Sequence, residues 1–65
     1  MAISKIEQLL IGFLETSKAS EPEKTLAFLA MDTEEQMLKL CHFLSENPEA
    51  TSKTVYEAAK RISKE

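Results

Sequence analysis

Residues 33–46 read TEEQMLKLCHFLSE, and this stretch carries the clearest helical period in the chain. Its apolar residues recur three and four positions apart, which is the spacing that puts side chains on one face of an α-helix. This narrow stripe consists of Met37, Leu40, Cys41 and Leu44. Thr33 with Gln36 three positions later is typical of a capped helix start. Asn47 before Pro48 predicts the end of the helix, because the residue before a proline avoids helical angles.

Patterns of the same kind on either side predict three more helices. The four expected helices span about residues 4–18, 21–31, 33–46 and 52–63. Ser4 and Ser20 each precede a glutamate by three positions, as capped helix starts often do. Thr54 is the candidate cap of the fourth helix, with Thr51 and Ser52 as alternatives. Short connections make consecutive helices neighbours, so we predict an all-α, antiparallel-like bundle of four short helices.

The composition supports this fold class and limits what the chain can do. One glycine and two prolines in 65 residues disfavour a β-rich domain, which needs frequent turns. We expect a single domain over residues 1–65, too small for a large cofactor or a deep substrate cleft. No apolar run approaches the length of a bilayer span, and a lone cysteine cannot form an internal disulfide. We therefore expect a cytoplasmic protein without a membrane segment.

Residues 41–46 contain the conventional candidates for catalysis and metal binding. Cys41 and His42 are adjacent, so on a helix their side chains point about 100° apart and cannot form a hydrogen-bonded dyad. His42 and Glu46 lie one turn apart and offer two metal ligands, fewer than a tetrahedral site needs. Cys41 falls on the apolar stripe, which predicts a buried thiol. We therefore expect no enzyme activity, no catalytic or metal-binding residue, no cofactor and no small-molecule substrate.

The second helix has apolar side chains all round, which are difficult to bury in so small a bundle. Its two sides carry Leu26, Leu29 and Ala30 on one, and Ala27, Phe28 and Met31 on the other. Because exposed apolar patches mark association sites, we expect a protein–protein interaction module. The predicted interface residues are Ile11, Phe28, Met31, Leu38 and Phe43. A second copy of the chain is the expected partner, since a two-fold homodimer is the commonest closed oligomer.

Residues 38–62 suggest an alternative function in nucleic-acid binding. They combine an apolar helix, the segment NPEAT at 47–51 and a further helix with the paired alanines Ala58 and Ala59. This pattern resembles the first two helices of the helix-turn-helix in many bacterial regulator domains. The resemblance implies a third helix that enters the major groove, which residues 63–65 do not supply, and the net charge of −3 argues against DNA as a partner. The candidate nucleic-acid contacts are Lys53, Lys60, Arg61 and Lys64.

A third interpretation is an acidic inhibitor or adaptor that docks on a larger basic protein. Asp32, Glu34 and Glu35 would then attract the partner electrostatically. The two glutamates also suit the positive end of the helix dipole at the start of the third helix. Their position in the sequence therefore has a structural reason as well.

Overall fold

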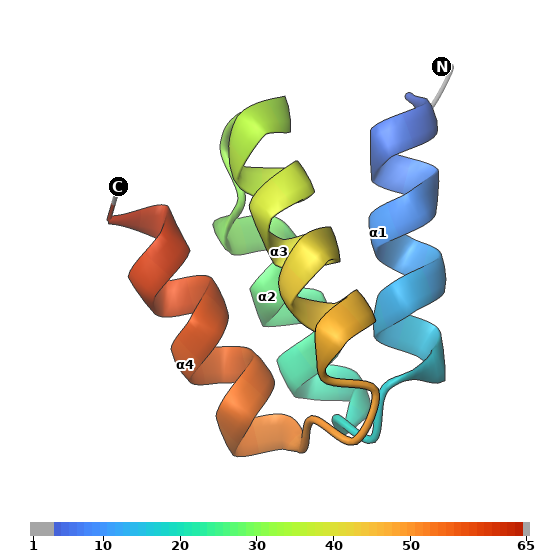
Figure 1. Cartoon of the computed structure of the whole chain (residues 1–65). Helices are drawn as coiled ribbons and strands as arrows, with labels where there is room; N and C mark the ends of the chain where they lie inside the picture. The colour runs from blue at the N-terminus through green and yellow to red at the C-terminus, as the bar shows by residue number, and fades with distance from the viewer. Residues whose placement is uncertain (1–3, 65) are drawn as a thin grey trace.

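The computed structural model describes residues 4–64, and within them it contains four α-helices and no strand (Figure 1). The helices are α1 (Lys5–Thr16), α2 (Glu21–Ala30), α3 (Glu34–Glu46) and α4 (Ser52–Ser63). The predicted all-α fold is confirmed, and each helix lies within the range expected from its periodicity. None of these four helices is both long enough and apolar enough to span a membrane.

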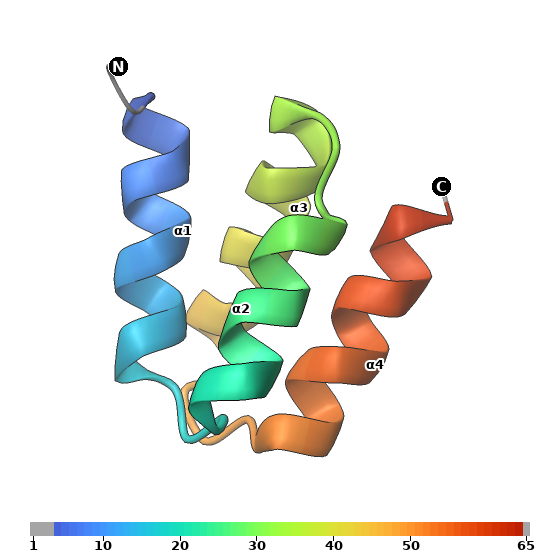
Figure 2. The same ribbon diagram turned by 180° about the vertical axis from the view of Figure 1, so that it is seen from behind.

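The chain reverses direction at each connection, so α1 and α3 run one way and α2 and α4 run the other (Figure 1). Helix α3 is in front in Figure 1 and α2 is in front in Figure 2, while α1 and α4 occupy the two sides. The most extensive backbone contacts join α1 to α3 and α2 to α4, which are parallel pairs. The expectation that consecutive helices are neighbours is therefore wrong for α2 and α3, which lie at diagonal corners of the bundle.

Alanines explain why α2 packs on α4 and not on the helix that follows it. Ala27 on α2 and Ala58 and Ala59 on α4 are almost completely buried. Small side chains at a contact let two helix axes approach closely. The connection at residues 31–33 reverses the chain, but α2 makes far less contact with α3 than it makes with α4.

The core contains residues from all four helices. Leu10, Leu40 and Val55, from α1, α3 and α4, are fully buried. The predicted stripe of α3 faces this core, although Met37 in its first half is only half buried. The remaining buried residues are Leu14, Ala19, Ala27, Met31, Cys41, Leu44, Ala50, Ala58, Ala59 and Ile62.

Two of the predicted helix starts have the expected hydrogen bonds. At α1, the Glu7 N–H donates to Ser4 Oγ at 3.1 Å, and the Ser4 N–H donates to Glu7 Oε1 at 3.2 Å. At α3, the Gln36 N–H donates to Thr33 Oγ1 at 3.1 Å. The Gln36 side chain accepts from the Asp32 N–H at 2.7 Å instead of returning to the cap. These bonds satisfy backbone groups that have no partner within the helix.

The other two helices start within their predicted ranges but have no side-chain capping bond. Helix α4 begins after Thr51, whose carbonyl accepts the Val55 N–H at 2.9 Å. Thr54 therefore lies inside the first turn, and the alternative Thr51 occupies the cap position without a side-chain capping bond. Ser20 precedes α2 as expected, but its hydroxyl donates to the Glu23 carboxylate and accepts no backbone N–H.

The connections 17–20 and 47–51 lie side by side at one end of the bundle (Figure 1). The Lys18 N–H donates to the Ala50 carbonyl at 3.2 Å, and the Ser20 N–H donates to Ser52 Oγ at 2.7 Å. An exposed ion pair joins Lys18 Nζ to Glu49 Oε2 at 2.6 Å. The hydrogen bond and the positive charge of Lys18 lower the pKa of Glu49. These interactions link the start of α2 to the start of α4 and align the two helices.

Met31 is a core residue and not the interface residue that the sequence predicts. Only 4% of Met31 is exposed, because the chain leaves α2 there in an extended conformation (φ −85°, ψ 110°) and the side chain joins the core. The opposite side of α2 is the outward one, with 52% of Leu26 and 67% of Leu29 exposed. The division of α2 into two apolar sides is correct, and the expected outward side is wrong.

Truncation of one residue on each side of α2 tests this orientation. We expect Met31→Ala to lower the free energy of unfolding by about 2–5 kcal/mol, the cost of a cavity in a core. Leu29→Ala removes an exposed side chain and should change the free energy of unfolding by no more than about 0.5 kcal/mol. Urea unfolding of the two variants measures these changes in the free energy of unfolding. The protein concentration is kept at low micromolar, where any self-association would add least to the stability of the fold. A larger loss for Leu29→Ala than for Met31→Ala would contradict the orientation.

Gly12 is a weak point of α1. It lies in the middle of the helix, and a Cβ atom added there would have no neighbour within 4 Å outside the helix backbone. Gly12→Ala should therefore raise the free energy of unfolding by about 1 kcal/mol, the difference in helix propensity. For a domain of this size the melting temperature should rise by about 4–8 °C. A thermal melt in which the variant unfolds at the same or a lower temperature would refute this expectation.

Candidate interaction surface

The predicted interface residues are distributed over α1, α2 and α3. Ile11 on α1 and Phe28 on α2 line one groove, so the fold brings these two together. Leu38 on α3 is 49% exposed and lies outside this groove. Phe43 is half buried and packs against the core. Phe28 is also half buried and packs against the core, so it contributes to the groove with Ile11 only through its exposed part.

Large exposed apolar residues extend this surface across α2 to α4. Leu26 and Leu29 lie on the outward side of α2, and Tyr56 on α4 is also exposed. We call the surface formed by these residues and the grooves beside them the α2 face. The α2 face consists of Ile11, Leu26, Phe28, Leu29, Ala30 and Tyr56. In Figure 2, α2 lies in the centre of this side of the molecule, with α1 and α4 to either side.

Two grooves flank α2 on this face. The groove between α1 and α2 has a volume of about 200 Å³ and includes Ile11 and Phe28. The groove between α2 and α4 has a volume of about 220 Å³ and includes Leu26 and Tyr56. Leu26 and Leu29 border different grooves, so α2 forms an apolar ridge between two apolar depressions.

Charged residues lie at both ends of the α2 face. Glu15 and Glu21 line the groove at the end where α2 begins, and Lys24 there pairs with Glu21 at 3.4 Å. Lys60, in the last turn of α4, lines the groove at the opposite end. The exposed acidic residues Asp32, Glu34 and Glu35 of the turn after α2 lie at the same end as Lys60, so charges of both signs occur at each end of the face.

The sequence prediction omits Leu26, Leu29 and Tyr56. Periodicity divides α2 into two apolar sides but does not identify the side that faces the core. Side-chain size could have identified the side of α2 that faces the core. The side with Ala27 can approach another helix closely, and the paired alanines of α4 offer a matching surface. Tyr56 lies outside the alanine stripe of α4, which is consistent with its exposure.

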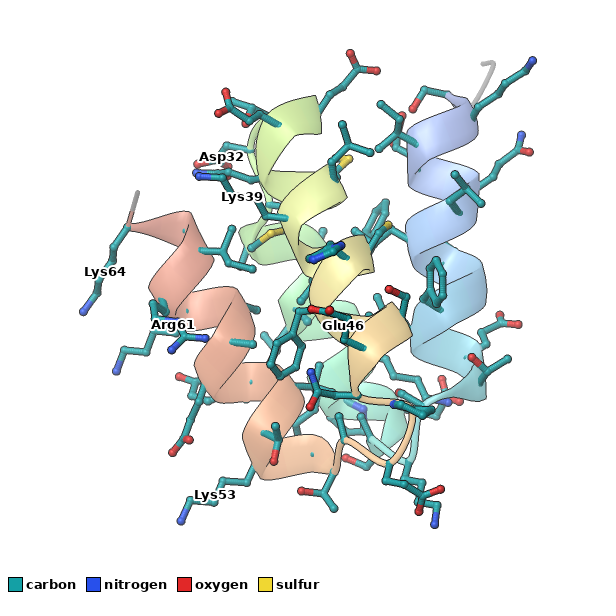
Figure 3. All side chains as sticks on the ribbon, in the orientation of Figure 1. Asp32, Lys39, Glu46, Lys53, Arg61 and Lys64 are labelled. Carbon is teal, nitrogen blue, oxygen red and sulfur yellow. The ribbon has the colours of Figure 1, made fainter. Side chains whose placement is uncertain are left out.

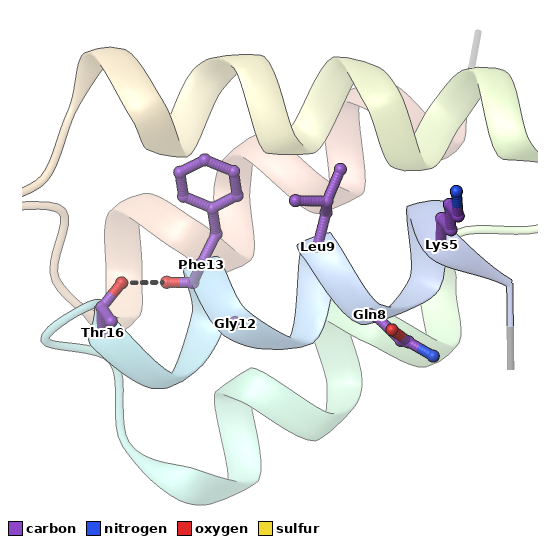
Figure 4. A pocket seen from close by; sticks show the side chains of 6 residues that line it. All are labelled: Lys5, Gln8, Leu9, Gly12, Phe13 and Thr16. Carbon is purple, nitrogen blue, oxygen red and sulfur yellow. Dashed lines mark hydrogen bonds between the residues drawn. The ribbon is translucent and has the colours of Figure 1, made fainter.

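A shallow, open hollow lies along α1 and is lined by residues of that helix alone (Figure 4). We call the residues that line it the α1 stripe: Lys5, Gln8, Leu9, Gly12, Phe13 and Thr16. Figure 4 shows Leu9 and Phe13 projecting from α1 toward α3, and Phe13 is half buried against the core. Leu9 is 55% exposed, so the hollow has an apolar rim in contact with water.

Within residues 4–64, the candidates for catalysis and metal binding do not form a site. The Cys41 thiol is buried in the core, and this burial raises its pKa above the usual value. The exposed side chains of His42 and Glu46 form a pair in which Nε2 and Oε1 are 3.1 Å apart. No group of three or more His, Cys, Asp or Glu side chains in this part of the chain is arranged to hold a metal ion.

All of the candidate nucleic-acid contacts are exposed on or just beyond α4. Figure 3 shows Lys53 near the start of this helix, Lys64 beyond its end and Arg61 between them. Lys60 lines a groove of the α2 face. Three of the four cations thus lie at the carboxyl end of α4, where the helix dipole favours positive charge, and Lys53 lies at the other end.

The candidate acidic residues lie at the turn between α2 and α3. Asp32, Glu34 and Glu35 are all exposed there. The two glutamates occupy the first turn of α3, where the helix dipole favours negative charge. Helix formation therefore accounts for their positions without a partner.

Comparisons of this chain with protein-family models, with curated proteins and with solved structures find no match. Within residues 4–64, the α2 face carries three of the five exposed large hydrophobic residues, namely Leu26, Leu29 and Tyr56.

Cys41 provides a chemical test of the core that lies behind these surfaces. Burial raises the pKa of the thiol and shields its sulfur, and only the thiolate reacts readily. At neutral pH we expect Cys41 to react with a chromogenic disulfide reagent about 100-fold more slowly in the native protein than in urea, since reaction requires local or global opening. Equal rates in the two conditions would show that Cys41 is accessible in the native fold.

Proposed function

We propose that the chain is a protein–protein interaction module that self-associates into a homodimer through the α2 face. The observation that carries this proposal is the exposure of Leu26 and Leu29 on one side of one helix, between two apolar grooves. Contiguous apolar surface of this kind marks association sites in soluble proteins. Phe28 and Tyr56 add aromatic side chains, which are enriched in the cores of interfaces.

The dimensions of the molecule are compatible with a dimer through this face. Its principal extents are 29 × 24 × 21 Å. A standard interface buries roughly 800 Å² of accessible surface on each partner, so a dimer through this face would cover a large share of one broad side of so small a molecule. Burial of apolar area at roughly 25 cal/mol per Å² is the favourable term that drives such a contact.

An antiparallel, two-fold arrangement suits the α2 face. In this arrangement Leu26 of one copy faces Leu29 of the other, and the same contact is repeated across the axis. In the same arrangement Glu15 of one copy approaches Lys60 of the other, which is a favourable contact at the edge of the interface.

We also propose that the module works by binding, without catalysis, in a reducing compartment such as the cytoplasm. A binding function of this kind needs no cofactor and no small-molecule substrate. The buried free thiol of Cys41 is compatible with that compartment, where cysteines stay reduced.

The mass of the chain in solution tests the dimer. At tens of micromolar, size-exclusion chromatography with light scattering should give about twice the 7.3 kDa of one chain. Leu29→Glu should halve this mass, because the new charge would be buried in an apolar contact, and should leave the helical circular-dichroism signal unchanged. Leu38→Glu is the matched control, since Leu38 is similarly exposed but lies on α3, and this variant should remain a dimer.

Two outcomes would contradict the proposal. One is a wild-type mass of 7.3 kDa at every accessible concentration. The other is a dimer that survives Leu29→Glu and dissociates in Leu38→Glu, which would assign self-association to α3 instead of the α2 face.

A further inference from the structure

Three lysines form a row along the outer side of α4. At about 100° per residue, Lys53, Lys60 and Lys64 lie within about 40° of one line on the helix, opposite the side that is buried in the core. All three are exposed, as is Arg61 beside them. Figure 3 shows Lys53 and Lys64 projecting away from the bundle near the two ends of α4. We call Lys53, Lys60, Arg61 and Lys64 the α4 cations.

Positive charge is separated from negative charge in this molecule. None of the α4 cations has an ion pair within residues 4–64, whereas Lys18 and Lys24 do. Glu57 is the one acidic residue in the segment 52–64, so this segment has a net charge of +3 and the rest of the chain has −6. The overall charge of −3 is therefore the sum of one basic helix and an acidic remainder.

The helix dipole accounts for only part of this arrangement. It favours Lys60 and Arg61 in the last turn of α4. Lys53, however, lies in the first turn, where the dipole disfavours positive charge. Among the four helices of residues 4–64, α4 is also the one without an acidic residue in its first turn. Helix stability therefore does not explain a row of cations that extends along the whole of α4.

We propose that the outer side of α4 binds single-stranded nucleic acid through the α4 cations and Tyr56. From Lys53 to Lys64 the row covers about 16 Å, at about 1.5 Å per residue. A nucleic-acid strand presents its phosphates as a linear series of negative charges, which a row of lysines complements without any cavity. The acidic remainder of the chain repels phosphates, so α4 is the side on which a strand can lie.

Tyr56 provides the aromatic side chain on which a base can stack. It is 45% exposed and lines the same groove as Lys60. A phosphate bound by Lys60 thus leaves a neighbouring base beside the Tyr56 ring. Stacking of this kind accepts any base, but the base must be unpaired, which favours a single strand over a duplex.

The composition of this surface argues against two other kinds of acidic partner. Lysine is depleted in the cores of protein–protein interfaces, and three of the α4 cations are lysines. A helix that lies on an anionic membrane inserts its own apolar side between the lipids, but the apolar side of α4 is buried in the core. Phosphate binding needs neither an apolar centre nor a free apolar side.

This inference does not depend on the proposed α2-face dimer. Lys53, Arg61 and Lys64 do not line either groove of the α2 face. Substitutions at these positions therefore leave the apolar contact of that dimer unchanged, and the mass of each variant is measured in parallel. A chain that is monomeric at every concentration should still bind a strand.

Fluorescence anisotropy with labelled oligothymidine and oligouridine tests the binding of a strand to the complete chain. A plot of the logarithm of the association constant against the logarithm of the salt concentration should have a slope of about −3, as expected for four phosphate contacts with a single strand. At about 50 mM salt, Lys53→Glu and Lys64→Glu should each weaken binding by about fivefold. Lys53→Glu also suits the dipole of α4, so it should not unfold the chain.

Two further substitutions test whether the row itself binds the strand. Glu57→Lys places a fifth cation beside the row and should strengthen binding by about fivefold. Lys5→Glu is the matched control for the charge reversals, because Lys5 is exposed on α1 and lies outside the row. It changes the net charge by the same amount and should weaken binding by less than about twofold.

Two variants at Tyr56 test the stacking contact. Tyr56→Leu keeps an apolar side chain but removes the ring, and should weaken binding by about tenfold. Tyr56→Phe keeps the ring and should bind as the wild-type chain does.

Four outcomes would overturn the proposal. One is the absence of binding to either oligonucleotide at several hundred micromolar protein and about 50 mM salt. The second is equal binding by the wild-type chain, Lys53→Glu and Lys64→Glu, or by Tyr56→Leu and Tyr56→Phe. The third is tighter binding to a duplex of the same length than to the single strand. The fourth is displacement of the oligonucleotide by polyglutamate or by phosphatidylserine vesicles at equal concentration of charge, which would assign the surface to an acidic protein or to a membrane.

Discussion

The close contact between α2 and α4 determines how much apolar surface this chain can bury. Ala27 on α2 and the paired alanines of α4 are almost fully buried, so the two helices meet through small side chains. Such side chains bring helix axes together but remove little apolar area from water. The larger side chains of Leu26 and Leu29 do not fit at that contact and lie on the outer side of α2. The packing that completes the fold therefore also creates the α2 face.

Local patterns predict the helices well, because each pattern depends on residues that are close in the sequence. The stripe of α3 and the capping bonds at Ser4 and Thr33 form within one or a few turns, so residue spacing is sufficient to find them. The pairing of α1 with α3 and of α2 with α4 is different. It depends on side-chain size at distant contacts and on the bonds between connections 17–20 and 47–51, about which periodicity contains no information.

The candidate surface is predictable only in part. The apolar residues all round α2 indicate that some of them stay exposed, and the exposure of Leu26 and Leu29 agrees with this. Periodicity does not identify the exposed side, because each side of α2 carries three apolar residues. Met31 is buried because the backbone becomes extended at the end of α2, a local change that a helical wheel does not represent. Ile11 and Phe28 meet only because α1 and α2 lie against each other in the folded bundle.

Exposed leucines contribute little to the stability of a single folded chain, because they remain largely in water in both the folded and the unfolded state. Their burial by a second copy would stabilise the folded state by mass action, so stability would increase with protein concentration. For a chain of 65 residues this gain is substantial, since a domain of such size buries only about 60% of the surface that its unfolded form exposes. In the proposed dimer, folding and association would therefore be coupled: the alanines that let α2 and α4 pack closely leave Leu26 and Leu29 exposed, and a second copy would cover these leucines.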